Sequence, residues 1–146
     1  MRHKIVHQKQ PTRNCCTSTC LAMILNRPVQ EVYDEFHDHW YNKHDKSIQD
    51  YLDALIAGGE NISYRTAQPS EMNRLHSGGL YLCTVPSLNV PGGLHHIVID
   101  FRDDKFIVYD PIKGWEGSKF YVGHDEDPDQ EGAFVIHSWI KDIEFL

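Results

Sequence analysis

Apolar residues in the first half of the chain recur three or four positions apart, which is the spacing of a helix that buries one face. This pattern predicts a first helix over residues 16–25 and a second from residue 28 to about residue 36. A third helix is predicted to begin at Ser47, because Ser47 and Asp50 have the spacing of a capping box, and to end at the glycine pair 58–59. The first half is therefore predicted to be helical.

Alternating and continuous apolar runs in the second half predict strands instead. The predicted strands lie at residues 62–65, 80–85, 95–101, 105–110, 120–122 and within 133–146. The third and fourth should form a hairpin, and a short helix is expected at 69–76. Helices followed by strands indicate the α+β class, with N-terminal helices packed on a mostly antiparallel sheet. The chain shows no repeat or linker, so we expect one domain over residues 1–146.

Composition and charge exclude several classes of protein. Of the 146 residues 40% are hydrophobic, the mean hydropathy is −0.49, and no run reaches the roughly 18 apolar residues needed to span a bilayer. The basic N-terminus lacks the apolar stretch of a secretory signal, so we expect a cytoplasmic protein with no membrane partner. Because 14 Lys and Arg face 21 Asp and Glu, the net charge is −7, and we expect no nucleic-acid partner.

Possible metal ligands occur in three places, and none has the spacing of a known type of site. The three histidines between residues 37 and 44 do not fall on one helical face, so a solvated loop is expected there. The acidic segment 125–131 lacks the spacing of an EF-hand and is expected to be an exposed loop. Cys16 and Cys20 would form one zinc pair, but a compact second pair is missing unless residues 95–96 supply it. We therefore expect no metal and no organic cofactor.

One of the four cysteines stands where a reactive thiol is expected. All four are expected to be reduced in a protein without a secretory signal. Cys16 lies at the start of the first predicted helix, where the helix dipole favours the nucleophilic thiolate. The alternative is that Cys15, Cys16 and Cys20 are small residues packed between helix and sheet.

Three further residues complete the parts of an activated-cysteine site. His95 and His96 open a predicted strand, so one imidazole is expected to face the helices and the other to face outward. Asp110 closes the partner strand and can orient the His95 ring, although Asp before Pro is also a common turn former. Gln10 precedes Cys16 and can join the Cys16 N–H in an oxyanion hole, or be an ordinary surface glutamine.

The order and spacing of these residues resemble the double-glycine-leader peptidases that process bacteriocins, which have the papain-like cysteine peptidase fold. Gln10, Cys16 and Cys20, followed by Leu-Ala-Met-Ile-Leu, are similar to the opening motif of that family. The segment 95–99 resembles its His-aromatic-Val-Val strand, and residues 110–114 resemble its Asp-Pro-x-x-Gly motif. The similar elements are spread over nearly the whole chain.

This resemblance implies a cysteine-dependent hydrolase, either a peptidase or an amidase, without a cofactor. Carried over residue by residue, Cys16 is the nucleophile and His95 is the general base and acid. Asp110 orients the imidazole, and Gln10 forms the oxyanion hole with the Cys16 amide. The implied partner is a peptide, protein or small-molecule substrate, and the oligomeric state is left open.

The chain departs from that family beside the nucleophile, where Cys15 and Thr17 stand in place of the usual Asp and Gly. Cys15 is thus a second candidate nucleophile, which the spacing to Gln10 and Cys20 disfavours. No transporter domain follows, so leader processing is not implied, and the chain is also similar to small stand-alone papain-like proteins of bacteria and phages. Two other functions stay open. One is a non-catalytic binder of a small ligand, such as a signalling nucleotide, in the same cleft; the other is an acyl transferase that uses the same thiol.

Overall fold

A computed structural model describes residues 3–68, 70, 74–123, 125–126, 133–135 and 139–146. Its helices are α1 (Cys16–Leu25), α2 (Val29–Val32), the π-helix η1 (Tyr33–Asn42) and α3 (Ile48–Ala57). Its strands are β1 (Tyr64–Thr66), β2 (Gly79–Pro86), β3 (Leu94–Phe101), β4 (Ile107–Tyr109), β5 (Phe120–Val122), β6 (Ala133–Val135) and β7 (Ile140–Phe145). The order of helices and then strands is that of the predicted α+β class.

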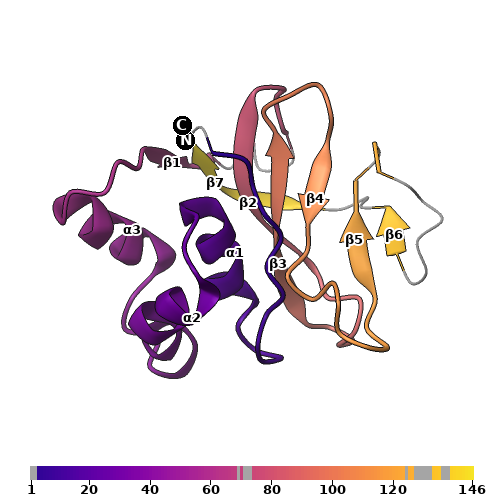
Figure 1. Cartoon of the computed structure of the whole chain (residues 1–146), viewed down its shortest axis with the longest axis horizontal. Helices are drawn as coiled ribbons and strands as arrows, with labels where there is room; N and C mark the ends of the chain where they lie inside the picture. Colours follow the sequence, from indigo (N-terminus) through magenta and orange to yellow (C-terminus); the bar gives the residue numbers. More distant parts are fainter. Residues whose placement is uncertain (1–2, 69, 71–73, 124, 127–132, 136–138) are drawn as a thin grey trace.

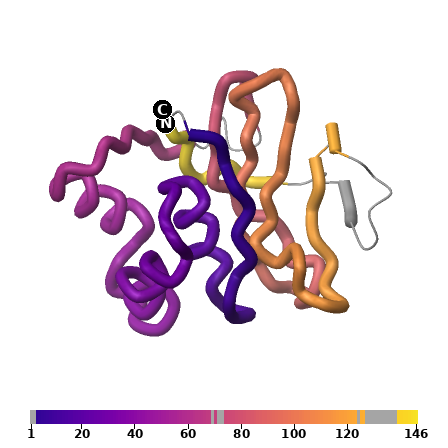
Figure 2. Tube along the Cα trace, in the orientation of Figure 1, coloured from indigo at the N-terminus to yellow at the C-terminus, as the bar shows by residue number. Residues whose placement is uncertain are grey.

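The main sheet has five strands in the order β1-β7-β2-β3-β4, and every neighbouring pair is antiparallel. A separate pair, β5 and β6, is parallel. The helices gather on one side of the main sheet, and the N-terminal segment that precedes α1 runs beside the sheet (Figures 1 and 2). The predicted hairpin is formed by β3 and β4, which places the start of β3 near the end of β4.

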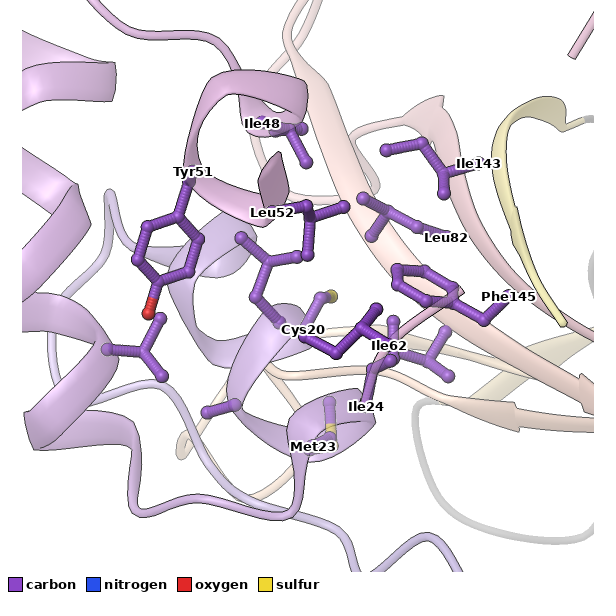
Figure 3. Packing of buried hydrophobic residues seen from close by; sticks show 14 of the residues in the cluster. Cys20, Met23, Ile24, Ile48, Tyr51, Leu52, Ile62, Leu82, Ile143 and Phe145 are labelled. Carbon is purple, nitrogen blue, oxygen red and sulfur yellow. The ribbon is translucent and has the colours of Figure 1, made fainter. Parts of the chain in front are cut away.

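Both faces of the main sheet are buried, as the apolar run of β2 requires. Leu80 and Leu82 belong to the core between the sheet and the helices, where they share one cluster with Leu52 of α3 (Figure 3). Tyr81 and Cys83 belong to a second cluster on the opposite face. Because successive residues of a strand point to opposite faces, β2 supplies both cores at once.

The helices at residues 16–25 and 48–57 have the predicted bounds. Asn26 ends α1 in the left-handed conformation, with φ of 56°. Ser47 and Asp50 form the predicted capping box, in which each side chain accepts the other residue's backbone N–H. These ends were predictable because the signals that set them are local.

The prediction of a solvated loop at residues 37–44 is wrong for residues 37–42, whereas residues 43 and 44 follow the helix and are exposed. The helix that begins at α2 continues as η1 to Asn42, and His37 is buried within it. Phe36 explains the continuation, because its ring is fully buried and packs against Trp40 and against Tyr51 of α3. Contact with α3 therefore keeps helical a segment whose own sequence is polar.

The other predicted elements differ mainly at their ends. The strand predicted at 62–65 is β1, which begins two residues later, and that predicted at 105–110 is the shorter β4. The helix predicted at 69–76 falls partly on residues 69 and 71–73, outside the described residues, and residues 74–76, which are described, are not helical. Residues 136–138 of the last predicted strand also lie outside them. No helix within the described ranges is long and apolar enough to cross a membrane.

The acidic segment after β5 begins with two residues that bind the sheet instead of lying free in solvent. Asp125 accepts the backbone N–H of Phe106 at 2.7 Å, and Glu126 accepts that of Val108 at 2.7 Å. These carboxylates satisfy donors on the outer edge of β4, the last strand of the sheet. Asp125 is exposed, as expected, but it and the half-buried Glu126 bind the sheet, while residues 127–131 lie outside the described residues.

Gly123 follows β5 and lies against the backbone of Phe106, which gives a first prediction. A Cβ at position 123 would lie 2.2 Å from the Phe106 carbonyl oxygen. We expect Gly123→Ala to lower the free energy of unfolding by about 3 kcal/mol, the upper end of the range for overpacking, in urea denaturation. Gly58→Ala is the matched control, because its nearest contacts would be at 3.5 Å. Equal stability of the two variants would contradict this packing.

Candidate active site

Cys16 is the first residue of α1 and lies at the positive end of the helix dipole. The residue before it, Cys15, makes no side-chain capping hydrogen bond with any described residue. The first backbone N–H groups of a helix have no partner inside the helix, so the Cys16 N–H is available to an oxyanion. The position predicted from the sequence thus provides both a nucleophile and a hydrogen-bond donor.

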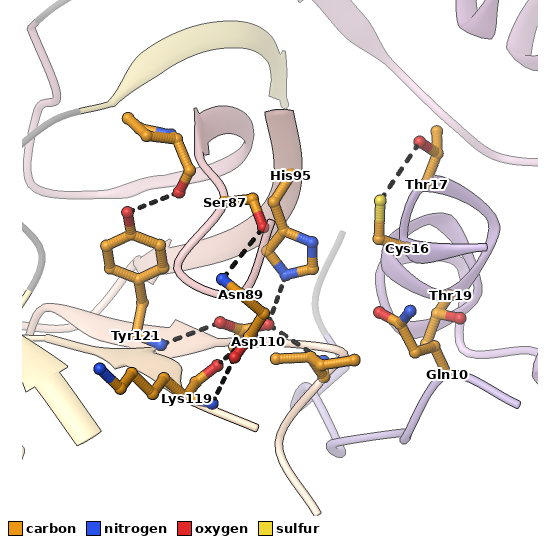
Figure 4. Close-up of polar contacts among 12 residues, drawn as sticks. Gln10, Cys16, Thr17, Thr19, Ser87, Asn89, His95, Asp110, Lys119 and Tyr121 are labelled. Carbon is orange, nitrogen blue, oxygen red and sulfur yellow. Dashed lines mark hydrogen bonds and ion pairs between the residues drawn. The ribbon is translucent and has the colours of Figure 1, made fainter. Parts of the chain in front are cut away.

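The imidazole of His95 lies between the thiol and a buried carboxylate (Figure 4). Its Nε2 is 2.6 Å from Asp110 Oδ1, and its Nδ1 points toward Cys16. Asp110 is only 1% exposed, and it also accepts backbone N–H groups from Ile112 at 3.0 Å and Tyr121 at 2.9 Å. Fixed donors on both oxygens hold the carboxylate in one orientation, and the carboxylate in turn orients the ring.

The electrostatics of the pair favour the charged forms of both groups. Burial alone would raise the pKa of Cys16, but hydrogen bonds and charges from His95 and His96 outweigh it and lower that pKa to about 5. Burial alone would lower the pKa of His95, whereas its contacts with Asp110 and Cys16 raise it to about 10. Between these two values the thiolate and the imidazolium are the stable forms.

Gln10 is held beside Cys16 by contacts with residues that lie far from it in the sequence. Its backbone N–H donates to the Pro111 carbonyl at 2.8 Å, and its own carbonyl accepts the Trp115 indole N–H at 2.7 Å. The side chain is 1% exposed; its Nε2 donates one hydrogen to Thr12 O at 2.8 Å, and the other hydrogen is available. Among the described residues, Gln10 Oε1 has no hydrogen-bond partner. The interpretation of Gln10 as a surface glutamine is therefore wrong.

The other three cysteines are buried away from this chemistry. Cys15 is 1% exposed, and its sulfur contacts the backbone of Thr12 at 3.4 Å. Burial raises the pKa of Cys20 and that of Cys83 well above the ordinary value. Cys16 alone among the four is partly exposed, which favours it over Cys15 as the nucleophile.

The two histidines take opposite faces of β3 as expected, but neither imidazole faces outward into solvent, because their side chains are only 13% and 15% exposed. His96 shares the helix-facing side of β3 with Val98, and its side chain is only 15% exposed. Its Nδ1 lies 2.7 Å from Thr17 Oγ1, and its Nε2 lies 3.6 Å from Asp142 Oδ2. Both imidazoles approach the thiol because Cys16 is the first residue of α1 and lies beside the start of β3, whose two faces carry one histidine each.

The site opens into a pocket of about 800 Å³, a size suited to a small molecule or a few residues of a peptide. Cys16, His95 and His96 line it together with Gln10. The remaining wall is largely apolar and includes Trp40, Tyr41, Ile48, Val90, Leu94 and Ile112. The pocket therefore admits a substrate to the thiol and offers apolar surface around it.

Metal ligation finds no support in the described ranges, where no group of three or more His, Cys, Asp or Glu has the geometry to hold an ion. His37 is stacked between Tyr33 and Tyr41, with ring centroids 4.3 and 5.3 Å away. His39 instead pairs with Asp45 at 2.9 Å. The histidines of this segment are thus used in packing and surface pairing.

Sequence reasoning missed Thr17 and Asp142 as members of the site. In the sequence Thr17 differs from the Gly usual in the similar family but indicates no role, and Asp142 belongs to no recognisable motif. The adjacent histidines were a signal, since a second imidazole entering a core strand needs polar partners of its own.

The Asp110 contacts predict the effect of removing its charge while keeping its shape. We expect Asp110→Asn to lower the pKa of His95, because the imidazolium loses its negative partner. It should also cost on the order of 1–3 kcal/mol of unfolding free energy, because an amide NH₂ would face a buried N–H. NMR titration and urea denaturation measure the two effects, with the exposed Asp104→Asn as control. An unchanged His95 titration would contradict this arrangement.

Comparison of the chain with protein-family models, with curated proteins and with solved structures gave no match. The assignment of a function therefore depends on the site itself.

Proposed function

We propose that this protein is a cysteine-dependent hydrolase, a peptidase or amidase with a papain-like fold. The observation that carries the proposal is the 2.6 Å contact between His95 and Asp110 beside the partly exposed thiol of Cys16, at the wall of an open pocket. A nucleophile on a helix, with its imidazole and carboxylate on neighbouring antiparallel strands, supports the papain-like assignment.

In the first half of the proposed reaction, the Cys16 thiolate attacks the carbonyl carbon of the substrate. A carbon–sulfur bond forms, and the carbonyl π electrons move to oxygen, which accepts hydrogen bonds from the Cys16 N–H and Gln10 Nε2. When the oxyanion collapses, the carbon–nitrogen bond breaks. His95 Nδ1 gives its proton to the departing nitrogen, which leaves as an amine, and a thioester remains on the enzyme.

The second half regenerates the thiolate. Neutral His95 takes a proton from a water molecule, whose oxygen attacks the thioester carbon. The carbon–sulfur bond then breaks, the electron pair returns to sulfur, and a carboxylic acid is released. The imidazolium and the thiolate are restored, so no cofactor enters the cycle.

The nucleophile assignment predicts opposite effects at adjacent cysteines. Cys16→Ala should reduce turnover of a library of peptidyl-aminomethylcoumarin substrates on the order of 10⁴-fold or more, because the attacking atom is lost. Cys15→Ala and Cys20→Ala should keep turnover, because both sulfurs are buried outside the pocket. Full activity of Cys16→Ala would overturn the assignment. Absence of turnover, together with a small ligand retained by both wild type and Cys16→Ala, would favour the non-catalytic binder.

The charged pair also predicts the pH range of activity. The thiolate is lost when the pH falls through about 5, and the His95 proton needed by the leaving nitrogen is lost when the pH rises through about 10. We therefore expect kcat/KM to form a broad plateau between these limits. A rise of kcat/KM only above pH 8, as for an ordinary thiol, would contradict the pairing.

A further inference from the structure

The imidazole of His96 has a polar partner at each of its two nitrogens. Nδ1 lies 2.7 Å from Thr17 Oγ1, and Nε2 lies 3.6 Å from Asp142 Oδ2. The hydroxyl of Thr84 donates to the same Asp142 oxygen at 2.5 Å. The Trp40 ring packs against the imidazole, with centroids 6.3 Å apart. His96 is therefore oriented by four elements of the fold.

Asp142 reaches this position because β7 is irregular there. Leu82 of β2 is paired with Ile143, whereas the next residue, Cys83, is paired with Lys141. Asp142 is the extra residue of a β-bulge, a device that turns a side chain out of the regular alternation. The bulge presents the carboxylate to His96 on the side of the sheet that carries the helices.

Thr17 extends the contacts of His96 to the reacting sulfur. Its Oγ1 lies 4.0 Å from Cys16 Sγ, and Figure 4 shows the hydroxyl beside the thiol. When His96 is protonated, Nδ1–H donates to Thr17 Oγ1, which leaves the Thr17 O–H able to donate to the Cys16 sulfur 4.0 Å away. The contacts thus form a chain from the Asp142 carboxylate through His96 and Thr17 to Cys16.

The charges that face His96 favour its cationic form. The titratable groups around it are Asp142 from β7, Cys16 from α1 and the neighbouring His95. Burial would lower the pKa of His96, but its contacts with Asp142 and Cys16 raise it to about 9. The sulfur therefore has a second imidazolium nearby, joined to it through Thr17.

We infer that His96 is a positioning residue of this site, which acts through Thr17 to stabilise the Cys16 thiolate independently of His95. The inference rests on the proposed hydrolase function. In a site with one imidazole, the positive partner of the sulfur disappears when that imidazole protonates the leaving nitrogen. Here His96 keeps its proton throughout the cycle, and its charge stabilises the sulfur when it departs as thiolate from the acyl-enzyme. His95 transfers protons, whereas His96 stabilises the negative charge on the sulfur.

The test is the rate of iodoacetamide alkylation at Cys16 as a function of pH, read by mass spectrometry and independent of any substrate. We expect His96→Phe to move the alkylation midpoint to higher pH, so that alkylation at pH 6 is about tenfold slower or more, one pKa unit being a factor of ten. Thr17→Val, which removes only the hydroxyl, should change the profile in the same direction by less. His39→Phe, at an exposed histidine paired with Asp45, should leave it unchanged.

A double-mutant cycle separates this role from a structural one. Because Asp142 acts on the sulfur through His96, Asp142→Asn should slow alkylation in the wild type but add nothing in the His96→Phe background. Additive losses, or a profile unchanged in both His96→Phe and Thr17→Val, would overturn the inference. If His96→Phe fails to fold in urea denaturation, Thr17→Val and Asp142→Asn still decide it. An ordinary thiol profile in the wild type would instead overturn the proposed hydrolase.

Discussion

The buried carboxylate of Asp110 is the interaction on which the site and much of the surrounding structure depend. An isolated carboxylate at 1% exposure would be costly, and this one is satisfied by the His95 ring and two backbone N–H groups. Its backbone carbonyl also contacts the ring of His7 at 2.8 Å. One residue therefore ties β3, β4, β5 and the N-terminal segment together. The orientation of the His95 ring therefore follows from the contact that satisfies this charge.

The remaining parts converge because α1 begins beside the start of β3. The helix end contributes Cys16 and its free N–H, and the first residues of β3 contribute the two imidazoles from opposite faces of the strand. Two carboxylates support these rings in different ways. Asp110 lies at the end of a regular strand, whereas Asp142 reaches its ring through an irregularity in the pairing of β7. The thiolate thus lies between two positive partners that are held by separate parts of the sheet.

Those features that depend on short stretches of sequence could be predicted from the sequence. The bounds of α1 and α3 follow from Asn26 and from the Ser47–Asp50 capping box. The approximate positions of the strands along the chain follow from the apolar runs. The grouping of Gln10, Cys16, His95 and Asp110 was anticipated from their order and spacing.

The missed features depend on tertiary contacts. The continuation of η1 needs the burial of Phe36 against α3, and the only local signal for it is Trp40, four residues after Phe36. Neither a bulge at Asp142 nor the bond from Thr17 to His96 has a local sequence signature, because both arise from how β7 and α1 meet the sheet. The use of Asp125 and Glu126 as acceptors for β4 is likewise a contact between distant segments.

The anchoring of Gln10 to Pro111 and Trp115 has a consequence for synthesis of the chain. Cys16 leaves the ribosome before the residues that support it, because its imidazoles, its supporting carboxylates and the residues that anchor Gln10 lie far downstream of it. A nascent chain therefore carries an unactivated thiol until the sheet is assembled. In the proposed hydrolase, the chemistry would be withheld until the strands that carry these residues have been synthesised.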